Sequence, residues 1–294
     1  AEKIDSEHIQ KLESWLESGC AGQMSYMHNN FDKSTNPSQL LENAQSVIIV
    51  GLNYNPPEME LFDRSLQTGK IASYACYEDY HTFIKKRLFE LADFINSSSD
   101  KDYHFKICVD SVPLAERALA VRAGLGFIGK NHMLINPVLG CKIFLGEIIT
   151  NLRLEYDAPV IVREIKCSHC QKCIKVCPTG ALRPDGLLDA SKCINYLTIE
   201  YKGEIPPELE EKIGDRLFGC EECINVCPYQ KNAHARKNTQ FIFHPERAQV
   251  NPDEVLNMTE ETFKAKFADS AIYRTGLDTL KRNAKICLTK RISS

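Results

Sequence analysis

The fold is decided by two cysteine-rich stretches, Cys167-Ser-His-Cys170-Gln-Lys-Cys173-Ile-Lys-Val-Cys177-Pro178 and Cys220-Glu-Glu-Cys223-Ile-Asn-Val-Cys227-Pro228. Such spacing is typical of proteins with two [4Fe–4S] clusters, in which the last cysteine of each run binds the other run's cluster. The second run lacks the first of the usual four cysteines, and Cys193, between the runs, can replace it. The spacing therefore assigns one cluster to Cys167, Cys170, Cys173 and Cys227, and the other to Cys177, Cys193, Cys220 and Cys223.

Two other uses of these cysteines explain the pattern less well. A disulfide framework needs an oxidising compartment, and the start of the chain shows no apolar signal segment or cleavage site. Structural zinc favours separated Cys-x-x-Cys pairs rather than three thiolates at steps of three followed by Cys-Pro. We therefore expect a cytoplasmic iron–sulfur protein. The remaining cysteines have no ligand spacing and are predicted to be buried small apolar side chains: Cys20, Cys76, Cys108, Cys141 and Cys287.

The chain is longer than an electron carrier requires. A two-cluster module needs roughly sixty to eighty residues, and a chain of 294 residues leaves room before it for a second hydrophobic core. The hydrophobic content of 43% is ordinary for a globular protein. No stretch approaches the roughly twenty apolar residues of a membrane-spanning helix, because the apolar Ser46–Asn53 is only as long as a strand.

Charge is distributed unevenly along the chain. The net charge of −3 argues against general coating of nucleic acid. From Lys264 to Ser294, eight lysines and arginines stand against two aspartates, so this segment carries +6 and the residues before it carry −9. A basic helical tail on an acidic body favours a polyanionic partner. A solvated charged helix explains the same residues, and on charge alone it is the more common explanation.

Hydrophobic periodicity predicts strands alternating with helices before the cysteines. Residues 1–45 have helical spacing, Gln45–Leu52 is predicted to be a buried strand, and Tyr80–Ile95 an amphipathic helix. His104–Val109 and Cys141–Thr150 are predicted as two further strands. This alternation indicates an α+β domain over residues 1–157, followed by a cluster domain over 158–238 and a short helical segment over 239–294.

One polar residue lies where layered α/β folds place ligand sites. Asp110 follows the predicted strand, with Ser111 as a predicted N-cap and Pro113 in the first turn of a helix over Leu114–Ala123. An aspartate at a strand's end beside a helix N-terminus can bind a ligand or stabilise the helix dipole. Asp79-Tyr80-His81 is a second possible acid–base group, although an aspartate that caps the following helix explains it too.

The stretch Gly124-Leu-Gly-Phe-Ile-Gly129 matches the dinucleotide-binding pattern only in its letters. That fingerprint follows a strand and opens a helix, whereas these glycines follow a predicted helix. Gly124 is therefore predicted to terminate the helix, and no nicotinamide cofactor follows from the pattern. A ligand can approach the backbone of this glycine-rich turn closely, and Lys130 and Asn131 follow at its exit. Such a turn is suited to the amides or phosphate of a large cofactor.

In combination, several stretches resemble the epoxyqueuosine reductase family, whose members use cobalamin and iron–sulfur clusters to complete queuosine in tRNA. The resemblance covers nearly the whole chain. It is carried by Val-Asp110-Ser-x-Pro-Leu, Glu116-Arg117, Gly124-Leu-Gly-Phe-Ile-Gly-Lys130-Asn131, Tyr74-Ala-x-x-x-Asp79-Tyr-His81, Phe144-Leu-Gly-Glu147-Ile, Cys193-Ile-Asn-Tyr-Leu-Thr-Ile-Glu200, Ser270-Ala-Ile-x-Arg274 and Lys281-Arg282-Asn283-Ala284.

The resemblance implies a nitroreductase-like cobalamin-binding domain joined to a ferredoxin-like domain with two [4Fe–4S] clusters. It implies that Asp110 donates a proton, and we expect corrin and substrate to cover Asp110 and keep it protonated. Lys33 and Ser73 stand where the family leads us to expect arginines, and the chain resembles a short form without the helical-repeat extension. The implied cobalamin contacts are Asp110, Lys130, Asn131, Phe144, Asn195 and Lys33; the implied tRNA contacts are Lys281, Arg282 and Asn283.

The resemblance thus implies reduction of epoxyqueuosine to queuosine at the wobble position of tRNA. We expect a monomer that receives electrons from an external low-potential donor such as a flavodoxin or ferredoxin. Two alternatives stay open on the sequence: a corrinoid reductase of small molecules, such as a reductive dehalogenase, or an electron-transfer subunit. The basic segment Lys264–Arg291 argues against the first, and the domain that precedes the clusters argues against the second.

Overall fold

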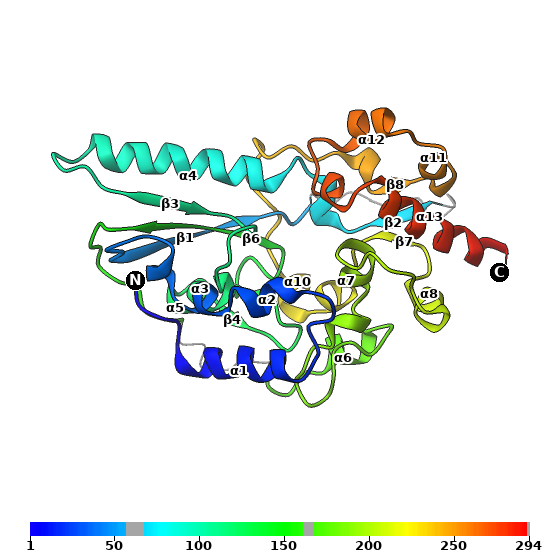
Figure 1. The fold of residues 1–294 in the computed structure, drawn as a ribbon, viewed down its shortest axis with the longest axis horizontal. Helices are drawn as coiled ribbons and strands as arrows, with labels where there is room; N and C mark the ends of the chain where they lie inside the picture. Colours follow the sequence, from blue (N-terminus) through cyan, green and yellow to red (C-terminus); the bar gives the residue numbers. More distant parts are fainter. Residues whose placement is uncertain (57–67, 161–166, 293–294) are drawn as a thin grey trace. The chain divides into compact units, whose positions relative to one another are not determined.

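The computed structural model describes residues 1–56, 68–160 and 167–292, which form two compact units (Figure 1). The first unit comprises residues 1–55, 81–171 and 228–234, and the second comprises 56–80, 172–227 and 235–294. Among the described helices, none is both long enough and apolar enough to cross a membrane. Because each unit is made of three separate stretches of the sequence, the chain passes repeatedly between the two units.

An antiparallel sheet of three strands is the centre of the first unit. Its order is β1 (Ser46–Asn53), β6 (Ile143–Thr150) and β3 (Phe105–Cys108), with β6 in the middle. Seven of the eight residues of β6 are buried, as expected for a central strand covered on both faces. The predicted strands are confirmed within one or two residues at each end.

Helices cover both faces of this sheet because neighbouring residues of β6 point in opposite directions. Gly146 has no side chain, and a Cβ there would lie 2.6 Å from Ile84 of α4 (Tyr80–Ser97), so the glycine lets α4 approach closely. Leu145, its neighbour, packs with Ala120 of α5 (Glu116–Arg122). Figure 1 shows α4 on one side of the sheet and α5 on the other.

The helix α5 ends as predicted but begins later than predicted. Gly124 has φ +77°, its N–H donates to Val121 O, and Leu125 N–H donates to Ala120 O. This pair of hydrogen bonds is the Schellman motif, so Gly124 terminates the helix. At the other end, the residue flanking the helix is Ala115, whose N–H donates to Ser34 O. The predicted N-cap Ser111 is therefore wrong, and the chain before Glu116 forms an irregular loop.

Short elements complete the first unit. The N-terminal helices pack beside α5 through Ile4, which contacts Ala118 and Leu119. Gly126 and Gly129 make a tight approach to Ile135, where a Cβ would lie 2.2 and 2.3 Å from its atoms. The elements are α1 (Ser6–Glu17), α2 (Ser25–Asn29), α3 (Phe31–Thr35), η1 (Pro37–Gln39), β4 (Phe127–Ile128), β5 (Leu134–Ile135) and α10 (Pro228–Lys231).

The second unit is built on a small mixed sheet. β2 (Gly69–Ile71) lies between β7 (Arg216–Phe218), which runs parallel to it, and β8 (Gln249–Val250), which runs antiparallel. One apolar core joins this sheet to the C-terminal helices, with Leu217, Phe263 and Leu280 almost fully buried in it. The helices of this part are α11 (Pro252–Leu256), α12 (Glu260–Phe267), η5 (Ala271–Thr275) and α13 (Leu277–Ile292).

The predicted domain order differs from this arrangement. Residues 239–294 were predicted to be a separate segment, but α13 packs on β7 and on α7 (Ile194–Ile199) and shares their core. Residues 56–80 were predicted to belong to the first domain, but β2 pairs within the second unit. The other elements of the second unit are η2 (Ser73–Cys76), α6 (Lys172–Val176), η3 (Ala190–Lys192), α8 (Pro207–Ile213), α9 (Glu222–Asn225) and η4 (Pro245–Arg247).

Candidate functional site

Asp110 occupies a left-handed turn immediately after β3. Its φ is +51°, a region that aspartate and asparagine adopt more readily than most side chains. The Asp110 N–H donates to Glu116 Oε1 at 2.7 Å, so the first residue of α5 holds the turn from behind. The position of Asp110 at the strand's end is as predicted, but its conformation comes from the turn and not from a helix cap.

The Asp110 carboxyl is exposed on one side and held on the other. His81 Nε2 lies 3.1 Å from Asp110 Oδ2, within hydrogen-bond distance. The His81 side chain, in the first turn of α4, is only 4% exposed, whereas that of Asp110 is 58% exposed. The buried imidazole therefore orients the Asp110 carboxyl, which is largely exposed. Of the predicted group Asp79-Tyr80-His81, only His81 contacts Asp110 among the bonds described.

Two further carboxyls lie behind Asp110 and were not predicted as site residues. Burial and, after it, the negative charge of Asp110 raise the pKa of Glu116 to about 7. Burial also raises the pKa of Glu147 well above the ordinary range, and Glu116 and Asp110 add to the effect. A signal was present in the sequence, because Glu147 is a charged residue inside the apolar strand Ile143–Thr150.

Four cysteines of the second predicted cluster lie close enough to influence one another's charge. Burial raises the pKa of Cys220 to about 11, and Cys193 contributes to the rise. Burial raises the pKa of Cys193 as well, with a contribution from Cys177. The pKa of Cys223 is raised by burial and then by Cys220, Cys193, Cys173 and Cys177. No cysteine forms a disulfide.

Within the described residues, no three histidine, cysteine, aspartate or glutamate side chains converge tightly enough to bind a single metal ion. Ligands of one zinc ion meet at metal–sulfur bonds of about 2.3 Å. The cysteines of a [4Fe–4S] cluster instead bind four separate irons and stand farther apart. The cluster assignment rests on the spacing of the cysteines and on the mutual influence of the thiols that lie together.

The first cysteine run begins beside Lys130. The Lys130 backbone N–H lies 3.4 Å from Cys167 Sγ and donates to it, while its Nζ donates to Ser168 O at 2.7 Å. Lys130 is thus engaged with the predicted cluster loop, and its contact with cobalamin stays a prediction. Cys167 and Cys170 belong to the same unit as Lys130, while Cys173 and Cys227 belong to the other unit.

The other predicted cofactor contacts differ in accessibility. Asn131 is buried and its Oδ1 accepts the Met133 N–H, and its contact with a cofactor stays a prediction. Phe144 is largely buried, with its ring centroid 4.3 Å from that of Tyr54. Lys33 and Asn195 are exposed. Ser73 stands where an arginine was expected, and its N–H and hydroxyl both donate to the Glu221 carboxylate.

Comparisons with known proteins match two parts of the chain to family models. The family described as "Epoxyqueuosine reductase QueG, DUF1730" matches residues 35–111, and the "4Fe-4S double cluster binding domain" matches residues 166–230. Epoxyqueuosine reductase of Cyclobacterium marinum is 40% identical over 277 residues, which are 94% of this chain and 87% of the relative. The chain belongs to the epoxyqueuosine reductase family.

Solved structures of the family superpose on nearly the whole chain. A crystal structure of epoxyqueuosine reductase with an epoxyqueuosine-modified tRNA-Tyr stem loop matches with a TM-score of 0.89 and 33% identity, covering 98% of this chain and 75% of that one. A Bacillus subtilis epoxyqueuosine reductase, in which a catalytic aspartate loop is swung out of the active site, matches with a TM-score of 0.87 and 32% identity over the same shares.

The cofactors of an epoxyqueuosine reductase fit the residues present to different degrees. The cysteines fit two [4Fe–4S] clusters, because such clusters are bound by cysteine thiolates that lie close together. Here the neighbouring thiols are close enough to raise the pKa of Cys223. For cobalamin, the exposed carboxyl of Asp110 and the exposed side chains of Lys33 and Asn195 are available, whereas Asn131 is not. The family's cofactors therefore suit this chain.

The predicted tRNA contacts of this chain lie on α13, and two of them bind backbone carbonyls inside the protein. Asn283 is 0% exposed, and its Nδ2 donates to Thr198 O and Leu217 O, so its predicted contact with tRNA is wrong. The Arg282 guanidinium donates to the carbonyls of Leu197, Tyr201 and Gly203, which anchors α13 to the end of α7. Lys281 is half-buried and remains available.

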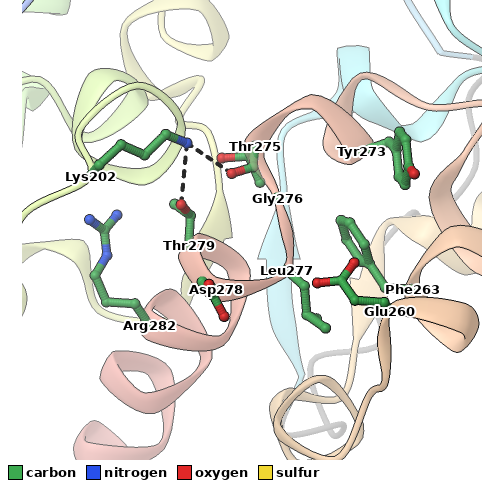
Figure 2. A pocket seen from close by; sticks show the side chains of 10 residues that line it. All are labelled: Lys202, Glu260, Phe263, Tyr273, Thr275, Gly276, Leu277, Asp278, Thr279 and Arg282. Atoms are coloured by element: carbon green, nitrogen blue, oxygen red, sulfur yellow. Dashed lines mark hydrogen bonds between the residues drawn. The ribbon is translucent and has the colours of Figure 1, made fainter.

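A pocket of about 650 Å³ opens beside these residues but has mixed charge (Figure 2). Lys202 Nζ donates to Thr275 O and Thr279 Oγ1, and Arg282 is engaged with carbonyls, so neither cation is unpaired. Glu260 and Asp278 add negative charge to the lining. The pocket is therefore poorly suited to a phosphate group and lies in the second unit, not with Asp110.

Proposed function

We propose that this protein reduces epoxyqueuosine to queuosine in tRNA, with Asp110 as the proton donor. The observation that carries the proposal is an exposed carboxyl, oriented by a buried imidazole, in a chain that shares 40% identity with an epoxyqueuosine reductase over 94% of its length. The relative solved with an epoxyqueuosine-modified tRNA stem loop supports tRNA as the substrate. A tRNA substrate also supports a cytoplasmic location.

The reaction sets what the residues of this chain must do. Converting an epoxide to an alkene consumes two electrons and two protons and releases the oxygen as water. When bound, the two [4Fe–4S] clusters and cobalamin supply the electrons, which no amino-acid side chain can provide. Asp110 donates a proton to the oxygen as its bonds to carbon break, and His81 keeps the carboxyl in one orientation.

The remaining roles follow from which side chains are accessible. The proposed cobalamin contacts are Lys33, Asn195 and the edge of Phe144. The cysteine sets assigned from spacing hold the clusters, and the grouping of Cys177, Cys193, Cys220 and Cys223 supports the second set. We further propose a monomer that accepts electrons from an external low-potential protein such as a flavodoxin or ferredoxin.

Turnover with the natural substrate class tests the proposed function. Protein that carries both clusters is supplied with cobalamin, a strong reductant and tRNA that contains epoxyqueuosine, and the nucleosides are then analysed by mass spectrometry. We expect the modified nucleoside to lose the mass of one oxygen, and to do so only when cobalamin is present. Electron transfer to cobalamin with no change in the nucleoside would reject the proposal and favour an electron carrier or another substrate.

Charge reversal on α13 is expected to weaken tRNA binding. Lys281 and Lys285 lie one helical turn apart on α13, and the structure records no carbonyl anchor for either, unlike Arg282. In the variant Lys281→Glu with Lys285→Glu we expect the affinity for tRNA to fall about tenfold near 0.1 M salt. Because each phosphate contact contributes about one to the slope of log K against log salt, that slope should fall by about two.

The control for this variant reverses two exposed lysines elsewhere, Lys86 and Lys101, and so makes the same change in net charge. An equal loss of affinity in both variants would show a general effect of charge. If the α13 variant bound tRNA with unchanged affinity, Lys281 and Lys285 would belong only to a solvated face of the helix.

A further inference from the structure

Lys130 contacts the first cysteine run through both its backbone and its side chain. Its backbone N–H donates to Cys167 Sγ at 3.4 Å, and its Nζ donates to Ser168 O at 2.7 Å. All three residues belong to the first unit, although Lys130 precedes Cys167 by 37 positions. A lysine from outside the cysteine motif is therefore bonded to a predicted cluster ligand and to the residue that follows it.

A tight turn between β4 and β5 sets the direction of the Lys130 N–H. Gly129 N–H donates to Met133 O at 3.0 Å, and His132 N–H donates to Gly129 O at 2.9 Å. Asn131, which is buried, accepts the Met133 N–H through its Oδ1 inside the same turn. These bonds do not involve the side chain of Lys130. A substitution of that side chain is therefore expected to leave the backbone donor in place.

The side chain of Lys130 brings a positive charge to the start of the cysteine run. Its ammonium group is bonded to the carbonyl of Ser168, which carries no net charge that could cancel it. A cluster and its four thiolates become more negative by one charge when they accept an electron, so a nearby cation favours the reduced form. A hydrogen bond to a ligand sulfur acts in the same direction.

We propose that Lys130 raises the reduction potential of the cluster bound by Cys167. This inference rests on the proposed function for the assignment of Cys167 as a cluster ligand. The external donor supplies one electron to that cluster, and the same electron later passes to cobalamin. Lys130 stabilises the state that holds the added electron, and no bond of the lysine forms or breaks. Lys130 is thus a residue that adjusts electron supply, not one that touches the epoxide.

A redox titration followed by electron paramagnetic resonance tests the proposal without turnover. Protein that carries both clusters is titrated without added cobalamin, so that a lost cobalamin contact cannot cause a shift. Lys130→Gln removes the charge, while its amide can still donate to Ser168 O. We expect the reduction equilibrium constant of the cluster bound by Cys167 to fall about tenfold, which corresponds to about 59 mV for one electron. Lys130→Arg keeps the charge and should keep the potential of the unaltered protein.

Two further variants make the assignment specific. Cys193→Ser is expected to retain the cluster bound by Cys167, so its remaining potential identifies that cluster. Lys106→Gln is the matched control, because it removes the charge of an exposed lysine on β3 in the same unit. It should leave both potentials unaltered. An equal fall in Lys106→Gln and Lys130→Gln would show a general effect of net charge and reject the role of Lys130.

The potentials of the Lys130 variants decide between charge and structure. A Lys130→Gln protein with about eight irons and unaltered potentials would overturn the proposal. A fall that Lys130→Arg shares would also overturn it, because the shape of the loop and not the charge would then be the cause. If Lys130→Gln lost a cluster, the decision would pass to Lys130→Arg: an unaltered potential there supports the proposal, and a lowered one rejects it.

The same measurements separate this inference from the proposed function. If the unaltered protein leaves epoxyqueuosine unchanged while Lys130→Gln has the lowered potential, the function fails and the role of Lys130 stands. If the unaltered protein converts epoxyqueuosine while Lys130→Gln has unaltered potentials, the role of Lys130 is rejected and the function stands.

Discussion

Asp110→Asn is expected to retain both clusters and cobalamin and to lose turnover by about 10²–10⁴-fold, the usual contribution of a general acid. Asparagine has the same shape and also tolerates a φ of +51°, so the turn after β3 should stay in place. The amide can still meet His81 but cannot release a proton to a developing oxyanion. The measurement is the rate of oxygen loss from the nucleoside under saturating reductant, together with iron and cobalamin content.

The matched control is Asp93→Asn, an exposed aspartate on α4 that is far from Asp110 in the sequence. It makes the same change in charge and should leave the rate unaltered. If Asp110→Asn turned over at the rate of the unaltered protein, Asp110 would be a residue that only stabilises its turn. If it lost cobalamin as well, its role would be in binding the cofactor and not in donating a proton.

Local sequence signals predicted the elements around Asp110 well. The strands β1, β3 and β6 and the helix α4 were expected from hydrophobic periodicity, which reports which face of an element is buried. Gly124 was expected to end α5, because the glycines followed a helix and not a strand, and its Schellman bonds confirm this. The five cysteines without ligand spacing are buried, as predicted.

Features that depend on long-range pairing could not be predicted in the same way. β2 is three residues long, and its membership of the second unit is decided by β7 and β8, which lie more than a hundred residues away. Asn283 carries no local mark of burial, because its partners are carbonyls at Thr198 and Leu217. Its polar side chain was taken for a surface contact when it is an internal one.

The carboxyls behind Asp110 show the same limit in the site itself. The sequence shows Glu147 as an unusual charged residue in an apolar strand, but its role depends on the residues near it in the fold. Glu116, whose charge raises the pKa of Glu147, is 31 positions away in the sequence, at the start of a helix whose first turn was predicted too early. Spacing within a short motif indicates candidate cluster ligands, but it carries no information about two carboxyls on different elements.

Cys193→Ser is expected to remove one cluster and abolish turnover. Cys193 is the one predicted ligand outside the two runs, so its assignment depends on the absence of a fourth cysteine from the second run. In the structure, Cys177 contributes to the raised pKa of Cys193, and Cys193 contributes to the raised pKa of Cys220 and Cys223, as sulfurs around one cluster would. Iron content should fall from about eight to about four atoms per chain, with the other cluster's absorbance retained.

The control is Cys287→Ser, which changes a buried cysteine of α13 that has no ligand spacing. It should keep about eight irons, although a buried hydroxyl in place of a thiol is expected to lower stability by about 1–3 kcal/mol. The two variants make the same chemical change at two shielded sites, so only the iron count separates a ligand from a packed side chain. If Cys193→Ser kept the full iron content, Cys193 would be a packing residue, and the second cluster would need a different fourth ligand.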